Sequence, residues 1–177
     1  MPNRATKVVA AVGGSLLAFS FIALFITTLF ADDEAHACSE QGIKFFRDNS
    51  CRGTANSDEI IGTANDDVIN GYDGNDMIHA GEGNDFVTGG EGNDTMYLGP
   101  GDDATRDHLG VEAIFGEEGK DIIRTGPEND KIDGGKGDDE MYGGPGSDTI
   151  TDGDHDESDN DILDGGLQAD EIFAGYG

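Results

Sequence analysis

A nine-residue unit recurs along most of this 177-residue chain, and its period is the strongest constraint on the fold. Eleven units follow one another from Gly53 to Thr151 without a break in register, and two more follow after a four-residue insertion, Asp152 to His155. Position six is Asp in twelve of the thirteen units, and position eight is apolar in twelve. A period this short predicts a stack of similar structural units rather than an ordinary layered domain.

Composition narrows the classes of protein to which the chain can belong. A formal net charge of -28 excludes a nucleic-acid partner, because such proteins need a basic surface. With 29 glycines and no Trp, the chain does not suit a conventional hydrophobic core, and low hydrophobicity with high charge usually indicates disorder. Here the carboxylates are periodic, so we expect bound cations to supply the cohesion that a core normally gives.

Each unit divides into a six-residue turn and a three-residue strand. Gly occupies position four in eight units, where it allows left-handed backbone conformations. Asn56 and Asn65 hold this position in the first two units, and Asn also tolerates that region. Positions seven to nine alternate, which directs the apolar side chains of position eight to one interior. These side chains are Ile60, Ile69, Ile78, Val87, Met96, Ile114, Ile123, Ile132, Met141, Ile150, Leu163 and Ile172.

A three-residue strand survives only when it stacks on similar strands, so we expect two units to form one coil. Units eighteen residues apart then lie about 4.8 Å from each other. The Asp at position six of one turn meets the next turn among main-chain carbonyl groups. Ca²⁺ takes six to eight oxygen ligands at about 2.3–2.6 Å, whereas Mg²⁺ demands a tighter octahedron. The spacing therefore predicts several bound calcium ions.

The units resemble GGxGxDxUx, the calcium-binding nonapeptide of the repeats-in-toxin (RTX) or haemolysin-type family. The units that match it best are GGEGNDTMY, GGKGDDEMY and GGPGSDTIT, and the resemblance extends over residues 53–173. It implies an all-β fold, a right-handed parallel β-roll (β-solenoid) of short strands with two nonapeptides per coil. It also implies calcium between successive turns, held by the Asp at position six and by turn carbonyls, and folding on calcium outside the cell.

The resemblance assigns the calcium ligands to two ladders of units eighteen residues apart. The first comprises Asp58, Asp76, Asp94, Glu112, Asp130 and Asp148, and the second Asp67, Asp85, Asp103, Asp121 and Asp139. Beyond the insertion, Asp161 and Asp170 are expected to continue them.

One unit of the array, DHLGVEAIF, departs from the pattern. Its Glu112 is one methylene longer than Asp, and Val111 replaces the usual polar residue. We expect the two calcium sites next to Glu112 to be weak or empty. In the following unit, Lys120 places a cation close to a third site.

The first 37 residues have the features of a targeting segment. Two basic residues precede an uncharged, mostly apolar stretch from Val8 to Phe30, and the small-residue triplet Ala35-His36-Ala37 follows. This pattern predicts a signal peptide cleaved before Cys38. The 23-residue apolar stretch is also long enough to span a bilayer, so a retained membrane anchor is the alternative. In both cases the rest of the protein is secreted or faces outside the cytoplasm.

Residues 38–52 are expected to cap the roll that residues 53–177 form. Cys38 and Cys51 most simply form one disulfide in an oxidising compartment. A redox or metal-binding pair is the alternative, but CxxC spacing and nearby His partners are absent. In the insertion, a solvated acidic loop is favoured over an additional weak cation site.

Calcium binding is the one activity that the sequence supports. We do not expect an enzyme, because the sequence contains neither HExxH nor GxSxG and few residues lie outside the array. The alternative is an adhesive or matrix module that binds a protein or surface partner through the ordered roll. The sequence stops at Gly177, inside another unit, so we expect either a fragment of a larger secreted protein or a frayed end.

Overall fold

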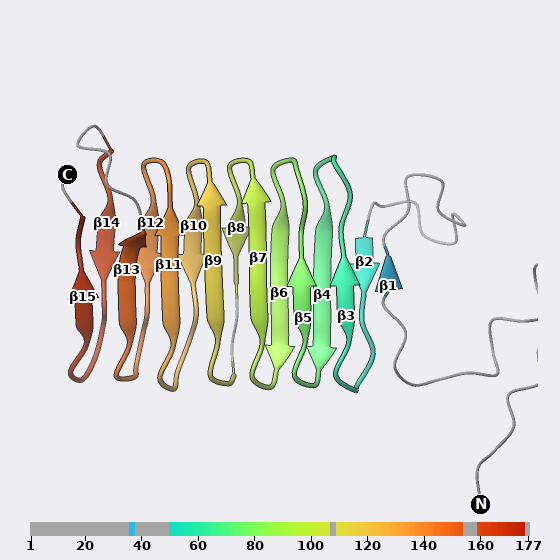
Figure 1. Ribbon diagram of the computed structural model, residues 1–177. Helices are drawn as coiled ribbons and strands as arrows, with labels where there is room; N and C mark the ends of the chain where they lie inside the picture. The colour runs from blue at the N-terminus through green and yellow to red at the C-terminus, as the bar shows by residue number, and fades with distance from the viewer. Residues whose placement is uncertain (1–35, 38–49, 107–108, 154–158, 176–177) are drawn as a thin grey trace, which may run out of the picture. The chain divides into compact units, whose positions relative to one another are not determined.

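The computed structural model describes residues 36–37, 50–106, 109–153 and 159–175. All the described residues belong to one compact unit. Those residues form no helix, and their strands stack as a parallel β-solenoid of about six turns, which confirms the predicted β-roll (Figure 1). In the described part of the chain, no helix is long and apolar enough to cross a membrane.

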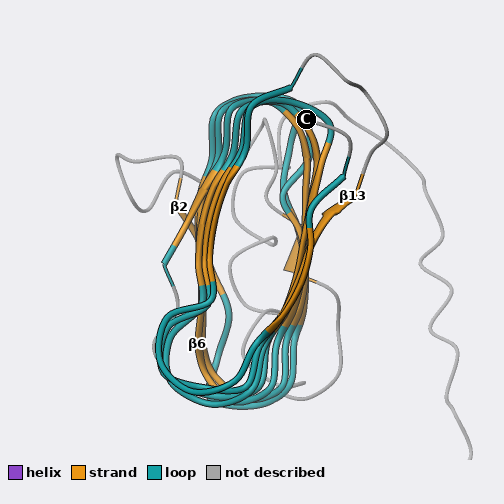
Figure 2. Cartoon of the chain, turned by 90° about the vertical axis from the view of Figure 1, so that its left-hand side faces the viewer, coloured by secondary structure: helices purple, strands orange, loops and turns teal. Residues whose placement is uncertain are grey.

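Two parallel sheets, joined by turns at both ends, make up the coils (Figure 2). Sheet A contains β1 (His36–Ala37), β3 (Glu59–Ile61), β5 (Met77–His79), β7 (Thr95–Pro100), β9 (Ala113–Glu118), β11 (Lys131–Gly135), β13 (Thr149–Gly153) and β15 (Glu171–Phe173). Sheet B contains β2 (Ser50–Arg52), β4 (Val68–Asp73), β6 (Phe86–Glu91), β8 (Ala104–Thr105), β10 (Ile122–Arg124), β12 (Glu140–Tyr142) and β14 (Ile162–Asp164).

The strand register confirms a coil of two nonapeptides. Ile60 pairs with Ile78 in sheet A, and Ile69 pairs with Val87 in sheet B, each across eighteen residues. The expected strand length of three residues is wrong for β4, β6, β7 and β9, which have six residues each, and for β11 and β13, which have five. These strands continue into the first positions of the next unit, because the neighbouring coils offer main-chain partners there as well.

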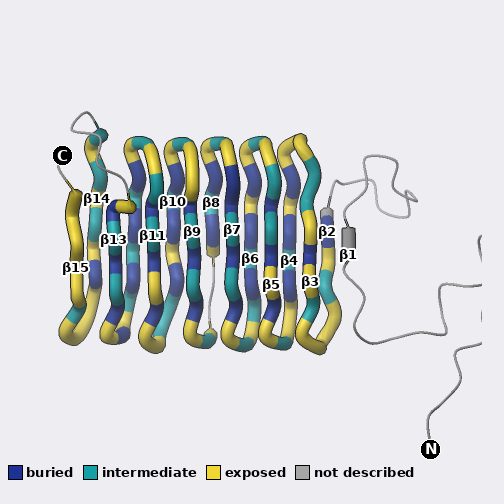
Figure 3. Tube along the Cα trace, in the orientation of Figure 1, coloured by how far each residue is buried: buried dark blue, intermediate teal, exposed yellow. Residues whose placement is uncertain are grey.

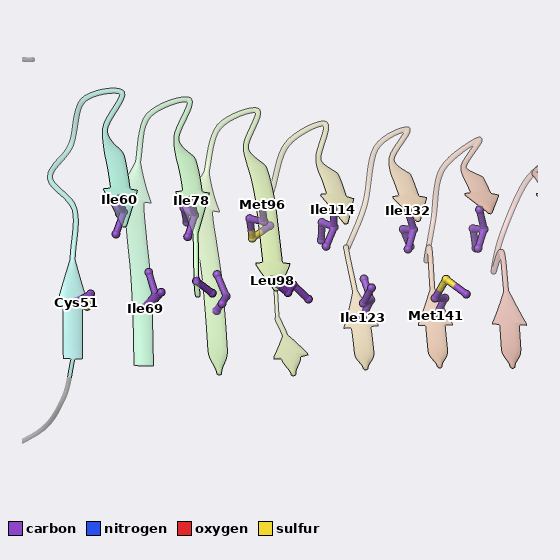
Figure 4. Close-up of a cluster of buried hydrophobic side chains, with 13 residues drawn as sticks. Cys51, Ile60, Ile69, Ile78, Met96, Leu98, Ile114, Ile123, Ile132 and Met141 are labelled. Carbon is purple, nitrogen blue, oxygen red and sulfur yellow. The ribbon is translucent and has the colours of Figure 1, made fainter. Parts of the chain in front are cut away.

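The core consists of two rows of apolar side chains, one from each sheet (Figure 4), and buried residues recur along most of the strands (Figure 3). Position-eight side chains from Ile60 to Ile150 are almost fully buried, as predicted. Position one also faces inward, since Ala80 and Leu98 are completely buried. The polar exception at position eight, Thr105, is buried too, and its hydroxyl accepts a 3.1 Å hydrogen bond from the Arg124 main-chain N–H. That bond removes the cost of an unsatisfied hydroxyl.

The last coil departs from the predicted interior. Ile172 is 44% exposed, so its assignment to a closed interior is wrong, and Leu163 is only partly buried. The physical reason is the position of β15, which pairs only with β13 and has no described strand on its other side.

The sheet register shows where the repeat shifts by four residues. Gly153 still pairs with Gly135 across eighteen residues, but the Asn160 N–H donates to Asp138 across twenty-two. The extra residues therefore enter after Gly153, later than the predicted insertion at 152–155. Asp152 belongs to β13 and is buried, whereas residues 154–158 lie outside the described residues.

The N-terminal end of the roll contains residues from two predicted segments, the end of the signal peptide at Ala37 and the cap that contains Cys51. Ala37 pairs with Ile61, so cleavage after Ala37 would separate β1 from sheet A. Cys51 pairs with Ile69 and is 8% exposed at the first end of the core. Cys38 lies outside the described residues, and the disulfide stays a prediction.

Position four of the turns shows why glycine is used there. Gly101 has a positive φ, and a methyl group on it would collide with the carbonyl oxygen of Gly83. The same expectation is wrong for Asn56 and Asn65, which do not adopt a positive φ. Their turns are closed differently, because the hydroxyl of Thr54 accepts a hydrogen bond from the Asn56 N–H at 3.2 Å.

Candidate metal sites along the turns

The aspartates at position six form two ladders of hydrogen bonds along the stack. From Asp76 onward, the Oδ1 atom of each of these aspartates accepts a bond from the main-chain N–H of the residue at position six one coil earlier. Asp76 accepts from Asp58 at 2.8 Å, and Asp85 accepts from Asp67 at 2.8 Å. The structure brings the predicted residues together along the same line, and further steps end at Asp94, Asp103, Asp121, Asp130, Asp139, Asp148, Asp161 and Asp170.

The second oxygen of these carboxylates is buried without a hydrogen-bond donor. Among the described residues this holds for the Oδ2 atoms of Asp76, Asp85, Asp103, Asp121, Asp130, Asp139 and Asp148. Each of these side chains is at most 3% exposed. A buried charge without a partner is strongly unfavourable, so a row of such oxygens indicates that a cation completes the site.

The pKa values of the ladder express the same cost. Burial raises the pKa of Asp121 to about 8 and that of Asp139 to about 7. It also raises the pKa values of Asp76, Asp85 and Asp103 to about 6. The N–H donors oppose this effect, while repulsion between ladder carboxylates adds to it. Without a cation, the deepest carboxylates therefore tend to bind protons near neutral pH.

In some units, such as those of Gly116 and Gly134, glycine at position one keeps the space beside the ladder oxygen clear. A Cβ atom on Gly116 would lie 2.5 Å from Oδ2 of Asp121 and against the carbonyl oxygen of Gly134. A Cβ atom on Gly134 would lie 2.7 Å from Oδ2 of Asp139. Any side chain at these positions would fill the space between carboxylate and carbonyl oxygens. The residues present therefore fit a calcium ion, which takes hard oxygen ligands from both kinds of group.

Side chains alone do not complete a metal cage. In the part of the chain that the structure describes, no three His, Cys, Asp or Glu side chains are placed to hold a metal ion together. A calcium site here would have to combine ladder carboxylates with main-chain carbonyl groups, which is the ligand set that the sequence predicts.

Asp58 and Asp67 differ from the rest of the ladder. Oδ2 of Asp58 accepts hydrogen bonds from the main-chain N–H and hydroxyl of Thr54, at 2.5 and 2.9 Å. Oδ2 of Asp67 accepts the equivalent bonds from Thr63, at 2.7 and 2.9 Å. Threonine at position two of the first two units thus supplies donors that the later units lack.

The side chains at position five also form hydrogen bonds between successive coils. The sequence interpretation missed this additional ladder, because it assigned these Asn and Asp residues to turn formation alone. Oδ1 of Asn75 accepts a bond from the Asn93 N–H at 3.0 Å, and Oδ1 of Asn84 accepts one from Asp102 at 3.2 Å. The frequent Asn or Asp at this position was the available signal. Because the ladder joins successive coils, it stabilises the stack directly.

The unit that departs from the pattern, DHLGVEAIF, still pairs with its neighbouring coils. Glu112 is 1% exposed, and its main-chain N–H donates to Oδ1 of Asp130 at 2.9 Å. The Lys120 ammonium lies 3.8 Å from Oε1 of Glu140, and the Lys120 side chain is about half exposed.

Replacing Glu112 with Asp is expected to strengthen calcium binding at the two neighbouring steps. The shorter side chain matches the other position-six residues, whose spacing is fixed by strands that pair across eighteen residues. Calorimetric titration would show additional or tighter binding in E112D than in the natural chain. E112Q is the matched control, since it keeps the length and removes the charge. An E112D isotherm identical to that of the natural chain would contradict the assignment.

Comparison with known families agrees with this geometry. A family model described as the RTX calcium-binding nonapeptide repeat (4 copies) matches residues 52–87, 71–104, 115–150 and 155–177. The interval between the second and third matches contains Glu112, the one position-six residue that is not Asp. No curated protein matches the chain.

Proposed function

Because the chain belongs to the RTX calcium-binding nonapeptide-repeat family, we propose that it is an extracellular calcium-binding protein whose β-roll folds as several calcium ions bind between stacked turns. One observation carries the proposal. The Oδ2 atoms of seven buried aspartates, Asp76 and Asp121 among them, have no hydrogen-bond donor although their Oδ1 atoms are all used. Oxygens that are buried and lack donors in this regular pattern are suited to cations.

The proposed ligands are the carboxylates of the two ladders together with main-chain carbonyls of the turns. Bound calcium supplies positive charge that offsets burial and mutual repulsion of the carboxylates. The chain's own part is to hold each carboxylate in place, which the bond from the preceding coil to Oδ1 does. Since each carboxylate lies between two coils, filling one step organises the next, and binding is expected to be cooperative.

In this proposal the first coil depends less on calcium for its stability than the later coils do. Asp58 and Asp67 are in the predicted ligand set, but Thr54 and Thr63 already donate to their second oxygens. Asp58 and Asp67 therefore lie at the ends of the two ladders and bind calcium more weakly than the aspartates of the later coils.

An extracellular setting is supported by the sequence of the first 37 residues. Calcium sites of extracellular modules commonly have Kd values of about 10⁻⁴–10⁻³ M. The proposed activity is binding, in agreement with a family whose repeats are structural and calcium-binding rather than catalytic.

Equilibrium dialysis against calcium tests the proposal directly. The natural chain is expected to bind several calcium ions, and D121A is expected to bind fewer because its step loses a carboxylate. D164A is the matched control, since Asp164 is exposed at the end of β14 and belongs to neither ladder. Failure of the natural chain to bind calcium at millimolar concentration would refute the function, as would equal losses in the two variants.

A further inference from the structure

The residues that point outward from the middle of sheet B include no acid over its first five strands, although the chain contains 38 Asp and Glu residues. Side chains at positions seven and nine point away from the core, because position eight points into it. From β2 to β10 these outward positions after Ser50 are Arg52, Val68, Asn70, Phe86, Thr88, Ala104, Arg106, Ile122 and Arg124. We name this set the basic face.

The charge of the basic face is positive. Arg52, Arg106 and Arg124 are all exposed and share position nine. The guanidinium of Arg124 lies 4.6 Å from the ring centre of Tyr142, which orients it along the sheet. Glu140, the next outward residue in β12, interacts with Lys120 at 3.8 Å and with the Tyr142 hydroxyl at 3.4 Å. Basic groups therefore predominate at positions seven and nine, although β4 and β6 end in the exposed acids Asp73 and Glu91.

Exposed apolar side chains lie among these arginines. Val68 is 51% exposed and Phe86 is 42% exposed. They belong to β4 and β6, between the strand of Arg52 and the residue Arg106 that follows β8. An apolar aromatic side chain flanked by guanidinium groups matches the chemistry of a membrane interface.

Sheet A offers no comparable surface among its described residues. Its outward residues include Glu59, Asp133 and Glu171, so its few basic groups are accompanied by acids. Three of its rings stack on one another, His79 on Tyr97 at 4.8 Å and Tyr97 on Phe115 at 5.0 Å, whereas Phe173 at the last coil is 50% exposed. The two faces of the roll therefore differ in charge, while both expose apolar side chains, such as Ile61 and Met77 on sheet A.

We propose that the basic face docks on an anionic phospholipid surface. Arginine pairs well with phosphate oxygens, and the side chains of Phe86 and Val68 would enter the region of the headgroups. The 23-residue apolar stretch from Val8 to Phe30 favours lipid over a soluble polymer, since its retention would hold the roll beside a bilayer. The acidic turns are compatible with docking because exposed charges are screened over about 8 Å at physiological salt.

A single tryptophan can report contact of this face with lipid. The chain contains no Trp, so F86W places the only one on the basic face, and M77W places it at a position on sheet A with nearly equal exposure, 45%. The probe is vesicles of phosphatidylcholine and phosphatidylglycerol in a three-to-one ratio, with phosphatidylcholine vesicles for comparison. Full-length chains in calcium are used, so any binding through residues 8–30 is common to both variants.

We expect anionic vesicles to shift the emission of F86W to shorter wavelength and to reduce its quenching by acrylamide. M77W should not respond, and neutral vesicles should not affect F86W. Adding R106Q and R124Q to F86W is expected to weaken the response about 30-fold, in keeping with two basic residues at an anionic surface. K131Q with K136Q removes the same charge elsewhere and should leave the response unchanged.

The proposal is overturned if F86W does not respond, responds equally to neutral vesicles, or is equally sensitive to both pairs of charge substitutions. Dextran sulfate provides a further arm. Protection of F86W by this polymer but not by vesicles would assign the face to a soluble polyanion and contradict a lipid partner. Calcium dialysis of the same variants keeps this result separate from the test of calcium binding.

Discussion

Removal of calcium by a chelator is expected to convert the roll into a largely disordered chain. The ladders bury carboxylates such as Asp121 and Asp139 completely, and the formal net charge of -28 opposes any compact state. The core offers little compensation, since it consists only of two rows of side chains between two sheets. Far-ultraviolet circular dichroism should therefore show β-structure in millimolar calcium and a disordered spectrum after chelation.

The size of this effect follows from ligand linkage. A site that binds only the folded chain adds about 2.7 kcal/mol when calcium is in hundredfold excess over Kd. Several such sites exceed the total stability of many domains, which is about 5–15 kcal/mol. Magnesium at the same concentration is the control and should restore little structure, because it requires a tighter octahedron. A chelated chain that keeps the full β-spectrum and its melting temperature would contradict the expectation.

Acidification of the calcium-free chain is expected to recover part of the folded state. The ladder pKa values are raised in the fold, to about 8 for Asp121 and about 7 for Asp139, from an ordinary value of 3.8. A group with a raised pKa favours the fold fully below its unfolded value, and this contribution disappears as the pH rises through the folded pKa. Calcium-free stability should therefore fall between about pH 4 and pH 8, with the largest contribution from Asp121.

Circular dichroism of the chelated chain across this pH range measures the effect. D121N is the matched variant, because it resembles the protonated carboxyl and removes a group whose pKa is raised to about 8. It should fold more readily than the natural chain without calcium at pH 8, and yet bind fewer calcium ions. Calcium-free stability that rises with pH, or a D121N chain that is less folded at pH 8, would refute this account of the ladder.

Much of the candidate site could be predicted because it depends on period. An aspartate at every ninth residue, such as Asp76 or Asp94, must recur at the same place in every coil of two nonapeptides. The behaviour of Asp58 and Asp67 could not be predicted, because it depends on where the hydroxyls of Thr54 and Thr63 lie. The ladder at position five was also hidden, since turn formation by itself accounts for the Asn and Asp residues there.

The sequence by itself determined the period, and the period determined the coil of two nonapeptides, the inward row from Ile60 to Ile150 and the alignment of the aspartates. These properties follow from local geometry repeated at a fixed interval. Only the tertiary structure decided which carboxylate oxygens lack a donor, where the register shifts after Gly153, and that three arginines share one face. Those properties depend on contacts between neighbouring coils, which the period places side by side but whose hydrogen bonds it does not specify.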